Sequence, residues 1–309
     1  MKAFLRLIRY QNLLMIALMQ LIFKYGFLDL QQITVALNDW QYLLLVLATV
    51  NIAAGGYIIN NVFDQETDLI NKPQNVVVGK FISENAAYNI YATMNIIGVG
   101  IAFYLSNYLG HPGLSTLFIV VAGTLYLYAS SLKRGLLVGN LIVAIISSLS
   151  ILVIGLFDLY PIITEENRLA MATLFEVMLD YALFCFIISF IREIVKDLED
   201  VDGDYNTGMR TLPIVLGVDR TAKLIFGLSI IPILILLYYT SAYYIVNKLY
   251  FATAYTLLLI IGPLIYFTIK MWTARTKKHF HHLSNVLKLV LFFGILSILV
   301  VTLNIMYHA

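Results

Sequence analysis

Charged residues are scarce in this chain of 309 residues: they make up 12% of it, while apolar residues make up 61%. A soluble globular domain is about 25% charged and about 45–50% apolar. So large an apolar excess does not suit a water-facing surface, which argues against a soluble enzyme, a nucleic-acid-binding protein and a disordered protein. The net charge of +2 provides no basic excess for a polyanionic partner.

Cysteine is nearly absent, since the chain holds only Cys185, inside an apolar run. One cysteine forms neither a disulfide framework nor a cysteine-based metal site. Proline is also rare, with 6 residues, and glycine contributes 18. These absences favour long uninterrupted helices over a barrel of short strands. The composition therefore predicts an all-α polytopic membrane protein.

Long apolar runs are abundant, and each run of about 20 residues is long enough to cross a hydrocarbon core as a helix. No small-residue cleavage site follows the first run, so we interpret it as a retained span and not a signal peptide. No separate soluble domain is evident, so residues 1–309 are expected to form one integral-membrane domain. The nine predicted spans are 10–28, 41–62, 87–106, 114–131, 136–157, 173–195, 222–246, 250–270 and 287–307.

The basic residues are distributed unevenly between the two sides that these spans define. Of the 20 lysines and arginines, only Lys24, Arg168 and Lys248 fall on the side opposite the N-terminus. Cytoplasmic loops of membrane proteins carry the excess of lysine and arginine. The asymmetry predicts a cytoplasmic N-terminus, a C-terminus on the opposite side, and two long cytoplasmic segments at about 63–86 and 196–221.

The first long segment begins with Asn60, Asp64 and Asp68, spaced four residues apart. On a helix that continues the second span, the three side chains project from one face. Like charges at this spacing destabilise a helix, so the pattern indicates a cation among them. Oxygen ligands without cysteine or histidine favour Mg²⁺, which binds through a few carboxylates together with substrate phosphates.

The second long segment follows the sixth span and places Asp197, Asp200 and Asp204 three and four residues apart, again on one helical face. Even-numbered spans end on the same side, so the two acidic segments can face each other. Basic residues accompany both, and lysine or arginine can hold phosphate oxygens while carboxylates hold the cation. The pattern predicts a site for a lipid diphosphate at the mouth of an apolar cavity. The accompanying basic residues are Lys72, Lys133, Arg134, Arg192, Lys196 and Arg210.

Together these residues resemble the motifs of the UbiA superfamily of intramembrane prenyltransferases. The first family motif has the form Asn-Asp-x-x-Asp-x-x-x-Asp, which Asn60–Asp68 matches except for Asn61. The second, Asp-x-x-x-Asp, matches Asp200–Asp204, and the pair Gly139-Asn140 extends the resemblance over most of the chain.

Within the superfamily, Arg192–Pro213 is most similar to the group of digeranylgeranylglyceryl phosphate synthases and their bacterial relatives. The family often follows its first motif with Asn-Arg-Pro-x-Arg-Pro, where this chain has Asn71-Lys72-Pro73-Gln74-Asn75-Val76. The second arginine of that pattern is missing.

The resemblance implies nine helices around a central cavity that opens to the cytoplasm and sideways to membrane lipid. It implies Mg²⁺-dependent transfer of a geranylgeranyl group from a prenyl diphosphate to a lipophilic acceptor, geranylgeranylglyceryl phosphate. Lys72, Lys133 and Arg134 are expected to take charge from the departing diphosphate, and Asp197 to position or deprotonate the acceptor, unless it forms a salt bridge with Arg192 or Lys196. The expected metal ligands are Asn60, Asp64, Asp68, Asp200 and Asp204.

Two other functions fit parts of the pattern. Prenylation of an aromatic quinone precursor would use the same donor site, whereas a glyceryl phosphate acceptor needs a second basic site, which Arg192, Lys196 and Arg210 could provide. An ion-coupled transporter would place its polar groups near the bilayer midplane. The acids here cluster at one membrane face, which favours the enzyme, and nothing indicates an obligate protein partner.

Overall fold

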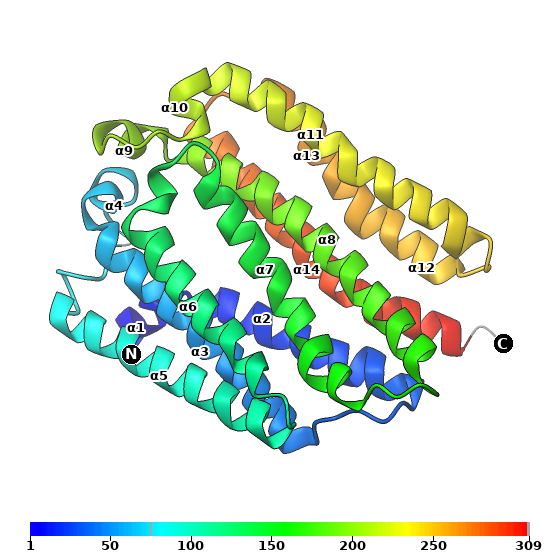
Figure 1. Ribbon diagram of the computed structural model, residues 1–309. Coiled ribbons are helices and arrows are strands. Elements are labelled where there is room, and N and C mark those ends of the chain that lie inside the picture. Colours follow the sequence, from blue (N-terminus) through cyan, green and yellow to red (C-terminus); the bar gives the residue numbers. More distant parts are fainter. Residues whose placement is uncertain (75, 308–309) are drawn as a thin grey trace.

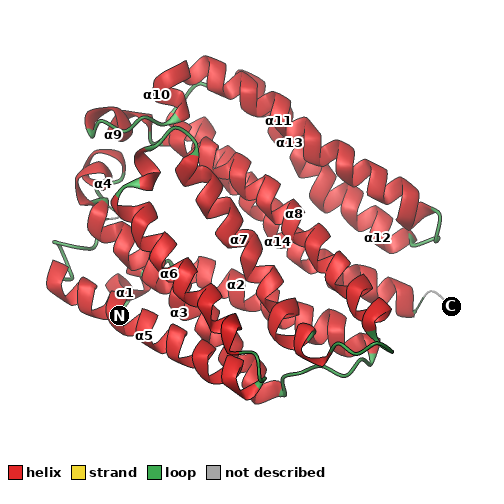
Figure 2. Ribbon diagram, in the orientation of Figure 1, coloured by secondary structure: helices red, strands yellow, loops and turns green. Residues whose placement is uncertain are grey.

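The computed structural model describes residues 1–74 and 76–307, and these fold into helices joined by short loops (Figure 2). Nine helical segments within this part of the chain are long and apolar enough to cross a membrane. They comprise Tyr10–Gln31, Asp39–Phe63, Glu84–Tyr108, Pro112–Ser130, Val138–Ile162, Arg168–Glu199, Val218–Ile245, Tyr250–Thr273 and Lys277–Met306. The prediction of an all-α protein with nine spans is confirmed.

The helices of these spans are connected by shorter ones at their ends. Three of the spans also contain π-helical turns, at Lys24–Leu28, Thr240–Ile245 and Thr256–Ile261. The α-helices are α1 (Lys2–Leu7), α2 (Tyr10–Phe23), α3 (Asp39–Phe63), α4 (Gln65–Asn71), α5 (Glu84–Tyr108), α6 (Ser115–Ser130), α7 (Val138–Asp158), α8 (Arg168–Glu199), α9 (Val201–Asn206), α10 (Leu212–Leu216), α11 (Val218–Tyr239), α12 (Tyr250–Tyr255), α13 (Gly262–Thr273) and α14 (Lys277–Met306).

Two spans begin five or more residues earlier than the apolar runs predict. The sixth starts at Arg168 instead of 173, and the ninth at Lys277 instead of 287. The ninth helix has a polar first turn, which Thr276 caps by accepting a hydrogen bond from the backbone of His279. Capping satisfies an otherwise unpaired N–H, so helix and membrane need not begin at the same residue.

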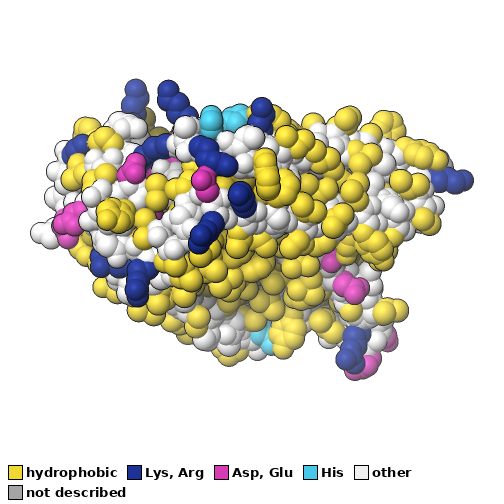
Figure 3. Space-filling view, turned by 90° about the horizontal axis from the view of Figure 1, so that it is seen from above, with side chains coloured by type: hydrophobic (Ala, Val, Ile, Leu, Met, Phe, Trp, Pro, Cys, Tyr) yellow, Lys and Arg dark blue, Asp and Glu magenta, His cyan; other side chains and the backbone are white. Residues whose placement is uncertain are grey.

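The short helices α4, α9 and α10 gather at one end of the bundle, which we call the motif end (Figure 1). The opposite end, where α2 and α7 finish, we call the far end. Figure 3 shows lysine and arginine side chains gathered toward the motif end and apolar side chains over much of the remaining face. This distribution matches a molecule whose long flank faces lipid.

A cavity of about 280 Å³ runs between the helices. Its lining residues come from α2, α3, α6, α7, α8 and α14, whereas α5 and the α11–α13 layer supply none of them. Six of the nine spans therefore enclose the cavity, and the others pack outside them.

Candidate active site

Both acidic motifs lie where a membrane-spanning helix meets a short one. Asp64 separates α3 from α4 with φ −95° and ψ 6°, and Asp200 separates α8 from α9 with φ −102° and ψ 10°. The expectation of one continuous helical face through each motif is therefore wrong. Backbone hydrogen bonds still link residues four apart across each junction, so the chain bends there without losing its pairing. The bends relieve the repulsion that aligned carboxylates impose on a straight helix.

Each central aspartate is paired with a lysine from another loop. The Lys133 ammonium contacts Asp64, which also accepts a 2.6 Å hydrogen bond from the Asn60 amide. Lys72 Nζ lies 2.8 Å from Asp200 Oδ2 and 3.1 Å from Glu199 Oε1. The two motifs thus carry matching ion pairs.

Asn71 joins the two motifs directly. Its side-chain amide donates to the backbone oxygen of Asp200 at 2.9 Å and accepts from the backbone N–H of Gly203 at 3.0 Å. A Cβ on Gly203 would lie 2.2 Å from the Asn71 amide, so the contact requires glycine. Lys277 at the start of α14 donates to the Asn71 backbone oxygen at 2.7 Å. One asparagine therefore fixes how α4 sits against α9.

Burial, together with neighbouring negative charge, raises the pKa of the carboxylates at this junction. Burial, followed by the charge of Asp64, raises the pKa of Asp68 to about 6. Burial and the charge of Asp200 raise the pKa of Asp204 to about 7. Burial also raises the pKa of Asp200, against the lowering effect of Lys72. Conversely, burial alone would lower the pKa of Lys72, but Asp200 and Glu199 raise it. A divalent cation would reverse the upward shifts of the carboxylates.

One carboxylate oxygen here is an open acceptor: Asp200 Oδ1 is buried and receives no hydrogen bond. Within residues 1–74 and 76–307, no three histidine, cysteine, aspartate or glutamate side chains converge closely enough to hold a metal ion on their own. Mg²⁺ is usually held by one or two carboxylates, waters and substrate phosphates. The oxygen donors therefore fit a cation that is shared with a bound diphosphate.

The loop between α6 and α7 contains two adjacent basic residues, Lys133 and Arg134, for which the sequence predicts the same role. Lys133 reaches the acidic motifs, whereas the side chain of Arg134 is exposed and its backbone oxygen accepts from the backbone N–H of Arg210. Gly139 allows this arrangement, because a Cβ there would lie 2.9 Å from the Lys133 backbone. Its neighbour Asn140 donates to Asp197 Oδ2 at 2.8 Å.

Asp197 thus has an amide partner. Among the described residues it forms no ion pair, because Lys196 lies 2.5 Å from Glu193 instead, and Arg192 lies 3.6 Å from the same carboxylate. The alternative of a salt bridge from Asp197 to Arg192 or Lys196 is therefore wrong.

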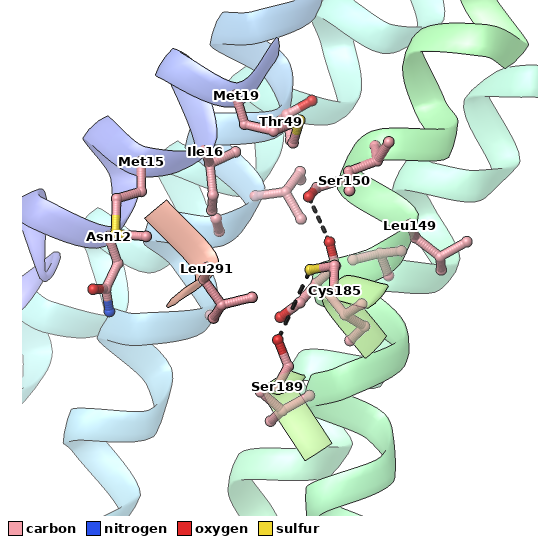
Figure 4. A pocket seen from close by; sticks show the side chains of 18 of the residues that line it. Asn12, Met15, Ile16, Met19, Thr49, Leu149, Ser150, Cys185, Ser189 and Leu291 are labelled. Carbon is pink, nitrogen blue, oxygen red and sulfur yellow. Dashed lines mark hydrogen bonds between the residues drawn. The ribbon is translucent and has the colours of Figure 1, made fainter. Parts of the chain in front are cut away.

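The cavity begins beside Asn60 and extends toward the far end between apolar side chains. Figure 4 shows part of its wall, with Met15, Ile16 and Met19 on α2 opposite Cys185 and Ser189 on α8. Arg192, Glu193 and Lys196 line its polar end, whereas Asp197 and Arg210 are not among the lining residues.

Two further cations line this polar end that the sequence reasoning missed. Arg9 lies between α1 and α2 in the left-handed region, with φ 49°, and its guanidinium stands 5.2 Å above the Tyr57 ring. A non-glycine residue held there is strained, as is common at functional sites. Lys288 enters from α14. Its position in an apolar run was the available signal, because ionisable residues within spans are functional candidates.

The UbiA prenyltransferase family matches residues 26–292. The chain belongs to this family. A digeranylgeranylglyceryl phosphate synthase from Saccharolobus solfataricus is 34% identical to it over 75% of this chain and 76% of that protein. The synthase of the same name from Sulfurisphaera tokodaii is 36% identical over 60% of this chain and 63% of its own length.

Solved UbiA-type structures share the fold over nearly the whole chain. A digeranylgeranylglyceryl phosphate synthase structure superposes with a TM-score of 0.63 at 23% identity, covering 97% of this chain and 98% of its own. A UbiA homologue from Archaeoglobus fulgidus, bound to DMAPP and Mg²⁺, superposes with a TM-score of 0.61 at 16% identity, covering 96% and 98%.

Two positions depart from the family motifs. Asn61, where the motif has aspartate, donates to the backbone oxygens of Tyr57 at 2.8 Å and Leu7 at 3.4 Å. It therefore faces α1 and the turn before it. The position of the missing second arginine, Asn75, lies outside the described residues.

The histidines at the start of α14 adjoin the acidic motifs. His281 Nδ1 lies 3.2 Å from Glu199 Oε1, the carboxylate that also contacts Lys72.

Asp180, nearer the start of α8, accepts a 2.6 Å hydrogen bond from Tyr239. His281 and Asp180 thus each have a partner within the protein.

Proposed function

We propose that this prenyltransferase transfers a geranylgeranyl group from geranylgeranyl diphosphate to the hydroxyl of geranylgeranylglyceryl phosphate. One observation carries the proposal: the mainly apolar cavity begins beside Asn60 of the first lysine-paired aspartate motif, and its polar end holds a second set of cations. The aspartate motifs with their lysines suit a diphosphate, and the cations at the polar end of the cavity suit a phosphate ester. The relatives that carry the name digeranylgeranylglyceryl phosphate synthase support this acceptor.

The donor site combines the acidic motifs with their lysines. Mg²⁺, when bound, neutralises diphosphate charge and so makes it a better leaving group. Lys72 and Lys133 form ion pairs with the aspartates that would hold the cation. As negative charge develops on the departing diphosphate, the two ammonium groups transfer their hydrogen bonds to its oxygens. Arg134, on the rim, supplies long-range attraction only. The residues that would hold the cation are Asn60, Asp64, Asp68, Asp200 and Asp204.

The acceptor site uses the cations that line the polar end of the cavity. Arg9 and Lys288 have no carboxylate partner among the described residues, while Arg192 and Lys196 share the single carboxylate of Glu193. Four cations around one acid in a partly buried cavity leave a positive charge that an acceptor phosphate would balance. An aromatic acceptor without an acidic group would not balance it.

The reaction breaks the bond between the allylic carbon and the diphosphate oxygen, and diphosphate leaves with the electron pair. The acceptor hydroxyl oxygen then forms the ether bond to the allylic carbon. Glu193, the acid that lines the cavity, takes the hydroxyl proton. Asp197 does not line the cavity, and through its hydrogen bond from Asn140 it positions α8 against α7.

The test is product formation by purified protein in detergent with Mg²⁺ and geranylgeranyl diphosphate. Geranylgeranylglyceryl phosphate competes with a panel of aromatic acceptors, and mass spectrometry identifies the products. We expect the glyceryl ether, and a loss of about 10²–10³-fold in kcat for Asp64→Asn and Asp200→Asn. Asp219→Asn is the matched control, since Asp219 is 68% exposed and its one ion pair among the described residues is with Arg275. Aromatic products, or full turnover by either motif variant, would contradict the proposal.

We also propose that the motif end faces the cytoplasm. After Cys185→Ser, single cysteines at exposed Asn206 and exposed Lys248 mark the two ends of the molecule. An impermeant maleimide added to intact cells should label only the cysteine at position 248. Labelling at position 206 instead would reverse the orientation.

A further inference from the structure

The lining of the cavity follows single faces of α2 and α8 from the motif end toward the far end. On α2 it passes from Asn12 to Phe23, eleven residues or about 16 Å of helical rise. On α8 it passes from Lys196 back to Tyr181, fifteen residues or about 22 Å. The cavity is therefore long and narrow, and only one of its ends is polar.

Aromatic rings close its apolar end. Phe23 is fully buried, and its ring packs edge-on against that of Tyr181 with centroids 5.5 Å apart. The Tyr181 hydroxyl lies 2.9 Å from Ser297 on α14, which fixes the ring. Phe118 closes another side, braced by Phe157 with centroids 5.7 Å apart.

The residues next to the aromatic rings that close the cavity (its aromatic floor) are also tightly packed. Phe27, 5% exposed, packs against Phe23 with centroids 6.2 Å apart but does not line the cavity. Lys24, the residue after Phe23, forms a buried ion pair with Asp158, 3.0 Å apart. Phe23 therefore stands between packed rings and next to a buried ion pair, so a prenyl chain that reaches it meets a side chain with little freedom to move.

We propose that Phe23 and Tyr181 act as a length stop that selects a donor of four isoprene units. This inference rests on the proposed function, in which the diphosphate is held beside Asn60 and its chain points toward the far end. An extended chain advances about 1.2 Å per bond, so each isoprene unit spans about 5 Å and four span about 20 Å. That length matches the run of α3 beside the donor site, since the fifteen residues from Asp64 back to Thr49 in the cavity lining rise about 22 Å.

Two variants should move donor preference in opposite directions. Phe23→Leu replaces a side chain of seven carbons by one of four, so it removes the ring and opens room for part of one five-carbon isoprene unit. Met19→Trp, one turn nearer the cations and also lining the cavity, raises the floor. Phe27→Leu is the matched control, since it alters a neighbouring buried ring outside the lining.

The experiment compares kcat/KM for C15, C20 and C25 prenyl diphosphates with one acceptor. Phe23→Leu should raise the C25/C20 ratio about tenfold and Met19→Trp the C15/C20 ratio about tenfold, while Phe27→Leu leaves both unchanged. Unchanged ratios in the two lining variants, or a shift in the preferred length of the acceptor chain instead of the donor, would overturn the length stop.

A binding measurement separates this inference from the proposed function. The three diphosphates, each with Mg²⁺, are tested for how far they raise the melting temperature of each variant. The best-stabilising length should move with the floor even if no glyceryl ether forms. Absence of ether from the wild-type protein overturns the proposed reaction, whereas an unmoved length optimum overturns the stop.

Discussion

Lys133 and Arg134 are neighbours in sequence, but only Lys133 contacts the acidic motifs. We predict that Lys133→Gln lowers kcat about 10²–10³-fold, since one group that stabilises developing charge is lost. Because the Asp64 carboxylate is then free, the Mg²⁺ concentration for half-maximal rate should not rise. Steady-state kinetics at varied Mg²⁺ tests both effects.

The matched control is Arg134→Gln, which removes an exposed cation from the same loop. Its kcat should stay within a few-fold of wild type, in keeping with the small contribution of exposed charges. Equal losses in the two variants would show that the loop acts through its net charge and not through the contact with Asp64.

Asn61 gives a second prediction at this scale. Its amide donates to two backbone oxygens, so Asn61→Asp would restore the family motif but set a carboxylate against two acceptors. We expect a stability loss of about 1–3 kcal/mol, seen as a lower melting temperature in detergent, with no gain in Mg²⁺ affinity. Tighter Mg²⁺ binding by the variant would show that position 61 turns toward the metal site.

Sequence spacing brought together the residues that share a motif, but not those that share only a cavity. Asp64, Lys72, Lys133 and Asp200 stand in short polar segments that break an apolar chain, and the structure places them in two matching pairs. Arg9 directly precedes the first span, and Lys288 belongs to the last. Their proximity to Arg192 depends on helix packing, which spacing along the chain does not encode.

At the scale of elements, the helix breaks at Asp64 and Asp200 were not predicted by the spacing of the acidic residues. Spacing of four residues predicts one straight face, and backbone bonds across each junction keep that pairing. What turns α4 and α9 toward each other is Asn71 at the end of α4, which bonds to Asp200 and Gly203 more than 120 residues further along the chain. No local pattern around either aspartate reveals that partner.

Gly203 tests the importance of this contact. Gly203→Ala would place a Cβ 2.2 Å from the Asn71 amide, so α9 must shift away from α4. We expect a stability loss of about 1–3 kcal/mol together with weaker Mg²⁺-dependent turnover, because the two acidic motifs separate.

Gly227→Ala is its control, since a Cβ there meets nothing within 4 Å and the residue lies inside α11. Replacing a helical glycine by alanine should stabilise by about 0.5–1 kcal/mol. Thermal unfolding compares the two variants, and a Gly203→Ala protein as stable as wild type would rule out a tight contact with Asn71.

For the whole molecule, hydropathy predicted nine spans but could not tell which six enclose the cavity. Lipid-facing and cavity-facing side chains are equally apolar, so composition cannot separate them. The number of basic residues on each side of the membrane predicted the orientation of the chain. It also placed Lys24 among three cations at the far end. In the structure Lys24 is 2% exposed, which leaves only Arg168 and Lys248 exposed there from that set.

The burial of Lys24 gives a prediction about how the far end is held together. Its ammonium lies 3.0 Å from Asp158, which is fully buried and also accepts a 2.8 Å bond from the backbone of Leu37. The pair thus ties the first span, α7 and the loop before α3. Removing one partner of a buried pair costs about 3–5 kcal/mol because the other charge is left uncompensated, and here the half-exposed Asp29, 3.7 Å from Lys24, compensates it only in part. Asp158→Asn should therefore lower the melting temperature sharply.

The double variant Lys24→Met with Asp158→Asn decides whether charge or shape matters. Methionine keeps the apolar stem of the lysine, and asparagine keeps the acceptor for the Leu37 N–H, so both charges vanish while the packing and one hydrogen bond remain. Because replacing a buried pair by neutral groups is often neutral or stabilising, the double variant should recover most of the loss seen in Asp158→Asn. A double variant as unstable as the single one would mean that the far end is held by the attraction of the pair itself.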